Sequence, residues 1–393
     1  MKIESIFSFF FNNHRRKQGM KKNMKVAALA VLSILGLAGC SNNSTQSDGK
    51  LNIAMLTDAG SITDGSYNQT TWDAITAYKN ENADKVGNVQ YFQPAKAETS
   101  GYEDAIAQAA KNGFNTIICP GFYFSTAFDN VAENYPDINF IGLDFDTEKQ
   151  HPNVATISYK ENESGVLAGY AAVIDGYTKL GFFGGAAQPA PIRYGLGYVY
   201  GAYYAAKELG LNDFSIDPKY YTYCGQYMAD GKFTTLADGW YTNGLEVIFT
   251  AAGGAGDSVI AASDANKNRM IIGVDTDEST KKDSVITSAT KGLKTAVFRE
   301  CNKIYENKFE AGHYDLGIAD DCCDVVLGDT ARFKNKENTV AKTKAFMEKL
   351  KKGEVIVPSY SVEDTTLADF KKALTSLGYD ASDALCNAIK GTK

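Results

Sequence analysis

Histidine and proline are scarce in this 393-residue chain, which has 3 histidines and 8 prolines. The histidines, His14, His151 and His313, are isolated, and the cysteines show no paired spacing of the kind that binds zinc. We therefore expect no metal site and no cofactor. The low proline count, together with 44% hydrophobic and 22% charged residues, excludes collagen-like and disordered classes and indicates a folded protein.

Clusters of basic residues are missing after residue 50, and the net charge of the chain is −7. A surface that binds nucleic acid neutralises phosphates with clustered lysine and arginine, so nucleic acid is not expected as a partner. A transcription regulator with two ligand-binding lobes would carry a helix-turn-helix ahead of the first lobe. In this chain, an apolar run followed by Cys40 stands in that place instead.

Catalytic motifs are also missing, because the chain has no nucleophile elbow, no zinc-binding His/Glu pattern and no Walker motif. The glycine-rich stretch AAGGAGDS follows a predicted strand, but the Gly-Lys-Ser/Thr ending of a phosphate loop is absent. Carboxylates that could act as general acid and base do occur near strand ends. Without a nucleophile or a paired histidine, we nevertheless expect a protein that is not an enzyme.

The apolar run near the N-terminus, Val26 to Leu37, is shorter than the about 20 residues that span a bilayer. It lies between a lysine-rich start and small residues before Cys40, the pattern of a signal peptide. The ending LAGC resembles the lipobox of bacterial lipoproteins, in which the cysteine is acylated. We predict a signal peptide over 1–39, with the start at Met20 or Met24, and a lipid anchor at Cys40 on the outer face of the cytoplasmic membrane.

Residues 40–50 are polar and rich in turn formers, which predicts a flexible tether between the anchor and the folded body. The other cysteines are scattered along the chain, which favours buried thiols over disulfides. The sequence assigns no particular disulfide, and we expect a monomer.

From Leu51 onward, short β-branched or aromatic runs alternate with longer segments of helical period, which predicts an α/β fold with parallel sheets. A first series of strands is expected at 51–57, 88–92, 115–120, 138–144 and 153–158. A second series is expected to begin at residues 179, 214, 245 and 270. The two series predict two similar lobes, each with a parallel sheet flanked by helices.

The chain is expected to cross between the lobes more than once. The N-terminal lobe is predicted to contain 51–158 and about 280–332, where a short strand and a helix return to it. The C-terminal lobe is predicted to contain 159–279 and about 333–393, with helices near 338–352 and 366–376. Ligands of open α/β sheets bind beyond the carboxyl ends of the strands, so two facing sheets predict a cleft.

The residues just past the predicted strands form a polar and aromatic set, which we take as the candidate ligand-binding site. Its members are Asp58, Asp64, Tyr67, Asn68, Asp144, Tyr194, Gly253, Gly254, Asp275 and Lys291.

Six ordered motifs carry these residues and resemble the basic membrane protein (BMP) family of lipoprotein solute receptors, which includes purine nucleoside-binding proteins of ABC transporters. The motifs are TDAGSITDGSYNQTTWDAI, FIGLDFD, PIRYGLGYVYGAYYAA, VIFTAAGGAGDSVIAA, IIGVDTDES and VITSATKGLKTAVF. The resemblance covers nearly all of 51–330 and implies a two-lobed type I periplasmic-binding-protein fold. Tyr67 departs from the family pattern, which has phenylalanine there.

The resemblance also implies a role for each position. Tyr67 and Tyr194 would clamp a nucleobase, and Asn68 and Asp144 would bind its polar edge. Asp275 and Lys291 would hold the ribose hydroxyls, and Gly253 and Gly254 would let the backbone approach the sugar. The chemistry fits, because an asparagine donates and accepts at once while an ionised aspartate only accepts.

The resemblance thus predicts a nucleoside, a purine nucleoside first, as the solute, ABC permease subunits as partners, and hinge closure around the solute as the mechanism. Three alternatives remain open. Asp64 is either a ligand contact or a cap of the helix that begins near Ser66. A sugar suits rings and aspartates as well as a nucleoside does. A surface sensor would need the same closure as a transport receptor.

Overall fold

The computed structural model describes residues 49–58, 60–361 and 366–392. Cys40, the predicted signal peptide and the predicted tether up to residue 48 lie outside the described residues. In the described part, the strands form two six-stranded sheets.

The first sheet has six strands in the order β11-β5-β4-β3-β1-β2, and every neighbouring pair is parallel. Helices cover a parallel sheet on both faces, which explains why the five residues of β3, Thr-Ile-Ile-Cys-Pro, are all buried. The strands are β1 Leu51–Leu56, β2 Val86–Phe92, β3 Thr116–Pro120, β4 Asn139–Leu143, β5 Val154–Tyr159 and β11 Gly312–Leu316.

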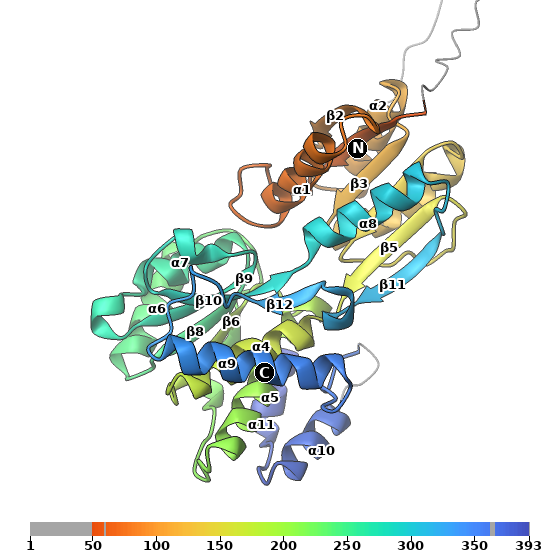
Figure 1. The fold of residues 1–393 in the computed structure, drawn as a ribbon. Helices are drawn as coiled ribbons and strands as arrows, with labels where there is room; N and C mark the ends of the chain where they lie inside the picture. The colour runs from red at the N-terminus through yellow and green to blue at the C-terminus, as the bar shows by residue number, and fades with distance from the viewer. Residues whose placement is uncertain (1–48, 59, 362–365, 393) are drawn as a thin grey trace, which may run out of the picture. The chain divides into compact units, whose positions relative to one another are not determined.

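The second sheet repeats this plan in the order β12-β10-β9-β8-β6-β7, with β12 antiparallel to β10 (Figure 1). Its strands are β6 Leu180–Gly184, β7 Tyr221–Tyr223, β8 Val247–Ala251, β9 Met270–Asp275, β10 Val285–Lys291 and β12 Cys323–Val325. The strand expected from residue 214 is wrong over most of its length. Pro218, which has no N–H to donate, opens a 3-10 helix at Pro218–Tyr220, and the strand begins only after it.

The segment expected to return to the first lobe, about 280–332, is divided between the sheets. Strand β10 pairs with β9 and β12 pairs with β10, so both belong to the second sheet. Strand β11 pairs with β5 in the first. The placement of the 285–291 strand in the first lobe is therefore wrong, because parallel pairing with β9 satisfies its backbone. The remaining lobe bounds stay a prediction.

Helices pack on both sheets. α8 lies against α1, while α4, α5 and α9 pack together beside the second sheet (Figure 1). The helices are α1 Tyr67–Glu81, α2 Thr99–Lys111, α3 Ser125–Val131, α4 Glu161–Ile174, α5 Pro189–Glu208, α6 Gly231–Thr242, α7 Gly254–Ala262, α8 Leu293–Tyr305, α9 Lys336–Lys351, α10 Ala368–Ser376 and α11 Asp383–Lys390. The helices predicted near 338–352 and 366–376 are confirmed as α9 and α10.

Helices α4 and α5 touch backbone to backbone through glycines on both. A Cβ added at Gly165 would overlap the carbonyl oxygen of Tyr194, and one added at Gly169 would overlap that of Tyr198. On the other helix, Gly197 faces the backbone of α4 in the same way. No side chain separates the two helices at these points, so an added methyl group would have to push them apart.

We expect Gly169→Ala to lower the free energy of unfolding by about 1 to 3 kcal/mol or more, because the added methyl group must push α4 away from α5. The matched control is Gly239→Ala in α6, where nothing lies within 4 Å of an added Cβ. There the better helix propensity of alanine should add about 0.5 to 1 kcal/mol. Guanidinium unfolding followed by circular dichroism measures both, and equal effects would contradict the close contact.

Candidate functional site

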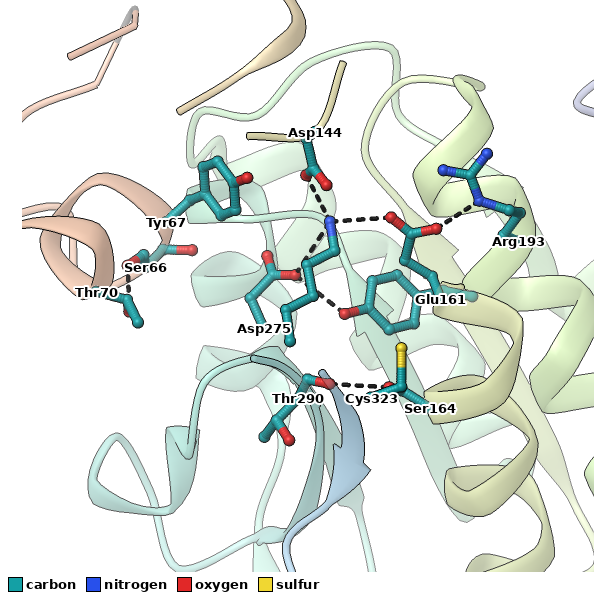
Figure 2. Close-up of polar contacts among 12 residues, drawn as sticks. Ser66, Tyr67, Thr70, Asp144, Glu161, Ser164, Arg193, Asp275, Thr290 and Cys323 are labelled. Atoms are coloured by element: carbon teal, nitrogen blue, oxygen red, sulfur yellow. Dashed lines mark hydrogen bonds and ion pairs between the residues drawn. The ribbon is translucent and has the colours of Figure 1, made fainter. Parts of the chain in front are cut away.

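Lys291, the last residue of β10, is the centre of a buried charge cluster. Its Nζ lies 2.5 Å from Asp144 Oδ2, 3.2 Å from Glu161 Oε1 and 3.9 Å from Asp275 Oδ1. Asp144 follows β4 of the first sheet, whereas Asp275 ends β9 of the second. The carboxyl ends of strands from both sheets therefore supply this cluster (Figure 2).

Asp144 and Asp275 share an unusual backbone conformation, with φ of 69° and 64°. This left-handed region disfavours most side chains, and aspartate and asparagine are among the few non-glycine residues that enter it readily. The two residues also occupy corresponding places in the two sheets. β4 is the third strand counted from β11, and β9 is the third strand counted from β12. The strand ends thus present two matching carboxylates.

Three tyrosine rings surround the ammonium group of Lys291. Nζ lies 5.4 Å from the ring centres of Tyr67 and Tyr159 and 5.6 Å from that of Tyr194, within the range of cation–π attraction. The Tyr194 hydroxyl donates to Asp275 Oδ1 over 3.1 Å. Within the described residues, the buried hydroxyls of Tyr67 and Tyr159 have no hydrogen-bond partner. Such groups call for an explanation, and a bound molecule would supply one.

Glu161, the first residue of α4, joins Lys291 to a second cation. Its Oε2 accepts from Arg193 Nε over 2.5 Å while Oε1 faces Lys291, and its side chain is fully buried. Arg193 lies one residue before Tyr194 on α5. Glu161, Arg193 and Tyr159 are absent from the sequence-based set of site residues, although Tyr159 and Glu161 lie just after the predicted strand at 153–158.

The pKa values of the cluster follow from burial opposed by pairing. Burial would lower the pKa of Lys291, but the carboxylates of Asp144, Glu161 and Asp275 raise it above its ordinary value. Burial would raise the pKa of Glu161, but Lys291 and Arg193 hold it below the usual range. For Asp275 burial prevails over Lys291 and raises the pKa to about 6. Near neutral pH, above the pKa of Asp275, two cations therefore oppose three largely ionised carboxylates.

The loop between β1 and α1 and the first turn of α1 carry three of the predicted residues, which bond to one another. Asn68 Nδ2 donates to Asp58 Oδ1 and to Asp64 Oδ2, each over 2.9 Å, and Asn68 Oδ1 accepts from the Asp58 backbone N–H. Asp64 also accepts from the backbone N–H groups of Ser66, Asn68 and Gln69. These bonds support the helix-capping alternative for Asp64 and engage both N–H groups of the Asn68 amide.

Gly253, which caps α7, and Gly254, its first residue, lie against Tyr227, which sequence reasoning missed. Gly253 has φ of 51°, and its added Cβ would lie 3.6 Å from Tyr227 Cδ1, while that of Gly254 would lie 3.0 Å from the Tyr227 carbonyl oxygen. The Tyr227 hydroxyl donates to Gln188 Oε1 over 2.9 Å. Burial raises the pKa of Tyr227, and the charges of Lys291 and Asp144 also act on it. Tyr227 therefore lies near the cluster.

Among the described residues, no helix is both long and apolar enough to cross a membrane.

The fold resembles that of a solute-binding protein of an ABC transporter from Aeropyrum pernix, with a TM-score of 0.68, 19% identity, and coverage of 86% of this chain and 99% of that one. A solute-binding protein from Conexibacter woesei matches with a TM-score of 0.64, 23% identity, and coverage of 79% and 99%. The predicted two-lobed type I periplasmic-binding-protein fold is confirmed.

The comparisons of sequence agree with those of structure. The ABC transporter nucleoside-binding protein BmpA of Lactococcus lactis is 32% identical over 316 residues, which cover 74% of this chain and 87% of BmpA. Basic membrane protein A1 of Borrelia garinii is 26% identical over 297 residues, or 73% of this chain and 83% of that protein. The model of the Bmp family, described as PnrA-like ABC transporter substrate-binding protein, matches residues 51–361. The chain belongs to this Bmp family of substrate-binding proteins of ABC transporters.

Proposed function

We propose that this protein is a lipid-anchored receptor that binds a nucleoside, a purine nucleoside first, and delivers it to its ABC permease by hinge closure. Membership of the family gives the coarser part: a substrate-binding protein that takes a small solute, works with a permease and is not an enzyme. The proposal adds the anchor at Cys40, the outer face of the cytoplasmic membrane and the identity of the solute. The name of the nucleoside-binding relative supports the last of these.

The observation that carries the proposal is the cluster of three rings and three carboxylates around Lys291. A nucleoside has a flat base with two faces for stacking, and each stacking ring contributes about 1 to 3 kcal/mol. It also has ribose hydroxyls, which donate well to carboxylates. Asp144 Oδ1 and the Tyr67 hydroxyl, both buried, have no hydrogen-bond partner within the described part of the chain and would suit these groups.

The ring assignments follow from burial. Tyr67 is proposed as one face of the clamp. The family resemblance predicts Tyr194 as the second face of the clamp. Tyr194, however, is only 2% exposed, and its hydroxyl is bonded to Asp275, so it suits a role in orienting that carboxylate. Tyr227 is less buried and lies on the glycines that were expected to approach the sugar, which favours it as the second stacking ring.

The charges favour a neutral solute. Lys291 and Arg193 offset Asp144 and Glu161, and Asp275, whose pKa is about 6, is mostly ionised at pH 7 and leaves the cluster with an excess of negative charge. A nucleotide would bring a phosphate dianion toward three carboxylates, with a large desolvation cost and little compensation. We therefore expect discrimination against nucleotides.

A sugar remains the second candidate, because the carboxylates of Asp144 and Asp275 suit hydroxyl groups of any kind. The Asn68 amide, which would favour a base over a sugar, spends both N–H groups on Asp58 and Asp64 and would have to exchange one of these bonds. A surface sensor would share every feature of the site and differs only in its partner.

A thermal-shift screen of residues 41–393 tests the proposal. We expect guanosine, inosine or adenosine to raise the midpoint of unfolding, since a ligand at 100 times its Kd adds about 2.7 kcal/mol to the free energy of unfolding. The matching 5′-monophosphates should give little or no shift because of their charge. A response to ribose or another free sugar alone would replace the nucleoside by a sugar, and silence from every compound would overturn the proposal.

A further inference from the structure

Glu161 makes none of the contacts with the solute that the proposed function requires. Its side chain is fully buried, and its two oxygens face two different cations, Lys291 on β10 and Arg193 on α5. A buried carboxylate is costly unless it is paired, and this one is paired twice. Lys291 in turn divides its attraction among Glu161, Asp144 and Asp275.

The first turn of α4 is tied to the end of β10 by more than this ion pair. Ser164 Oγ donates to the carbonyl oxygen of Thr290 over 2.8 Å, one residue before Lys291 (Figure 2). Gly165 and Gly197 bring the backbones of α4 and α5 into contact, which fixes Glu161 relative to Arg193. The carboxylate of Glu161 is therefore held in a fixed position, whereas the side chain of Lys291 beside it is long and flexible.

We propose that Glu161 is a positioning residue of the ligand site, which holds the ammonium group of Lys291 back from Asp275 so that the solute can reach the Asp275 carboxylate. Nζ lies 3.2 Å from Glu161 Oε1 but 3.9 Å from Asp275 Oδ1, so Glu161 is the nearer of the two. Lys291 already lies 2.5 Å from Asp144 Oδ2, so without the charge of Glu161 it would be drawn toward Asp275 and would occupy the oxygens of that carboxylate. The inference deepens the proposed function and rests on it for the identity of the solute.

The electrostatic surroundings give the expected sign of the pH effect. Burial raises the pKa of Asp275 to about 6, and the negative charge of Glu161 adds to that rise. Loss of this charge, with a closer Lys291, lowers the pKa of Asp275. The titratable and charged groups that face Glu161 or Asp275 are Lys291, Arg193, Asp144, Tyr67, Tyr159, Tyr194, Glu278 and Cys323.

The test is Glu161→Gln, with guanosine, inosine and adenosine as probes in calorimetric titrations between pH 5 and pH 8. We expect the affinity at pH 7 to fall about 10- to 100-fold, the range for losing the support of one charged partner. In the wild type, affinity should decline as the pH falls through about 6, because Asp275 becomes protonated. In the variant this decline should begin at a lower pH, a change that simple loss of stability does not produce.

Two further variants keep the test decisive. Glu163→Gln changes a carboxylate on the same turn that accepts from the Ile318 backbone N–H, and it should leave the affinity and its pH midpoint unchanged. Glu161→Gln with Arg193→Met removes both charges of the pair. This double variant should still show the lower pH midpoint of binding, and it serves as the test if Glu161→Gln alone folds poorly.

A measurement without solute separates this inference from the proposed function. The carboxyl carbon of Asp275, assigned by the loss of its signal in Asp275→Asn, can be titrated by carbon NMR in the unliganded protein. A lower pKa of Asp275 in Glu161→Gln than in the wild type supports the positioning role even if no nucleoside binds. An unchanged pKa of Asp275, or unchanged affinity and pH midpoint in a variant that binds nucleoside, overturns it.

Discussion

Lys291→Met is expected to lower the free energy of unfolding at pH 7 by about 3 to 5 kcal/mol and to abolish measurable solute binding. The methionine fills much of the same volume, so the loss comes from charge and not from a cavity. Lys291, with 3% of its side chain exposed, is the cation that Asp144, Glu161 and Asp275 share. Without it, the buried Glu161 and the partly buried Asp144 and Asp275 remain with Arg193 as the one cation of the cluster.

The pH dependence identifies the cause. Burial already raises the pKa values of Asp144 and Asp275, and the loss of Lys291 would raise both further. The deficit in unfolding free energy should therefore shrink as the pH is lowered from 7 to 5, because the carboxylates take up protons. The control is Lys294→Met, whose exposed pair with Glu81 should be worth well under 1 kcal/mol. Guanidinium unfolding at both pH values decides, and a deficit independent of pH would contradict the charge argument.

Much of the fold could be predicted from the sequence because buried parallel strands read as continuous apolar runs. Strands β3 and β8 have every residue buried, and their sequences stand out for that reason. The strand β12, in contrast, has three residues, and β10 pairs with it and with the preceding strand β9, not with a strand of the first sheet. No local pattern states which of two sheets a strand joins, and this explains the wrong placement of β10.

The candidate site was predictable only in part. The rule that ligands meet the carboxyl ends of strands placed Asp144, Asp275 and Lys291 in one set, and the structure brings them together. Glu161 was missed because a glutamate at the start of a helix is typical of a solvated residue that favours the helix dipole. Its complete burial depends on α5 and β10, which come later in the chain.

Asp275→Asn is expected to stabilise the unliganded protein and to weaken binding. The pKa of Asp275 is about 6 in the folded protein and 3.8 in the reference state, so folding disfavours the ionised form. A group of this kind supports folding fully below the lower value, and its support is lost as the pH rises through the higher one. Asparagine removes the cost of the charge above pH 6. We expect a gain of about 1 to 3 kcal/mol in unfolding free energy at pH 7.

The substitution is conservative in shape. Asparagine tolerates the left-handed backbone at φ of 64°, and its carbonyl oxygen can still accept from the Tyr194 hydroxyl. The gain should vanish near pH 4, where the aspartate is largely protonated in the folded protein. The control is Asp321→Asn, another left-handed aspartate at φ of 54° with 78% of its side chain exposed, which should change stability by less than about 0.5 kcal/mol.

The same substitution should lower the affinity for a nucleoside about 10- to 150-fold, since a hydrogen bond to a charged acceptor contributes about 1.5 to 3 kcal/mol. Stability and binding would then move in opposite directions, because the buried charge that costs folding energy is the one that meets the solute hydroxyls. Thermal unfolding and calorimetric titration on the same samples measure both. A variant with unchanged affinity would remove Asp275 from the site, and a variant without added stability at pH 7 would contradict its raised pKa.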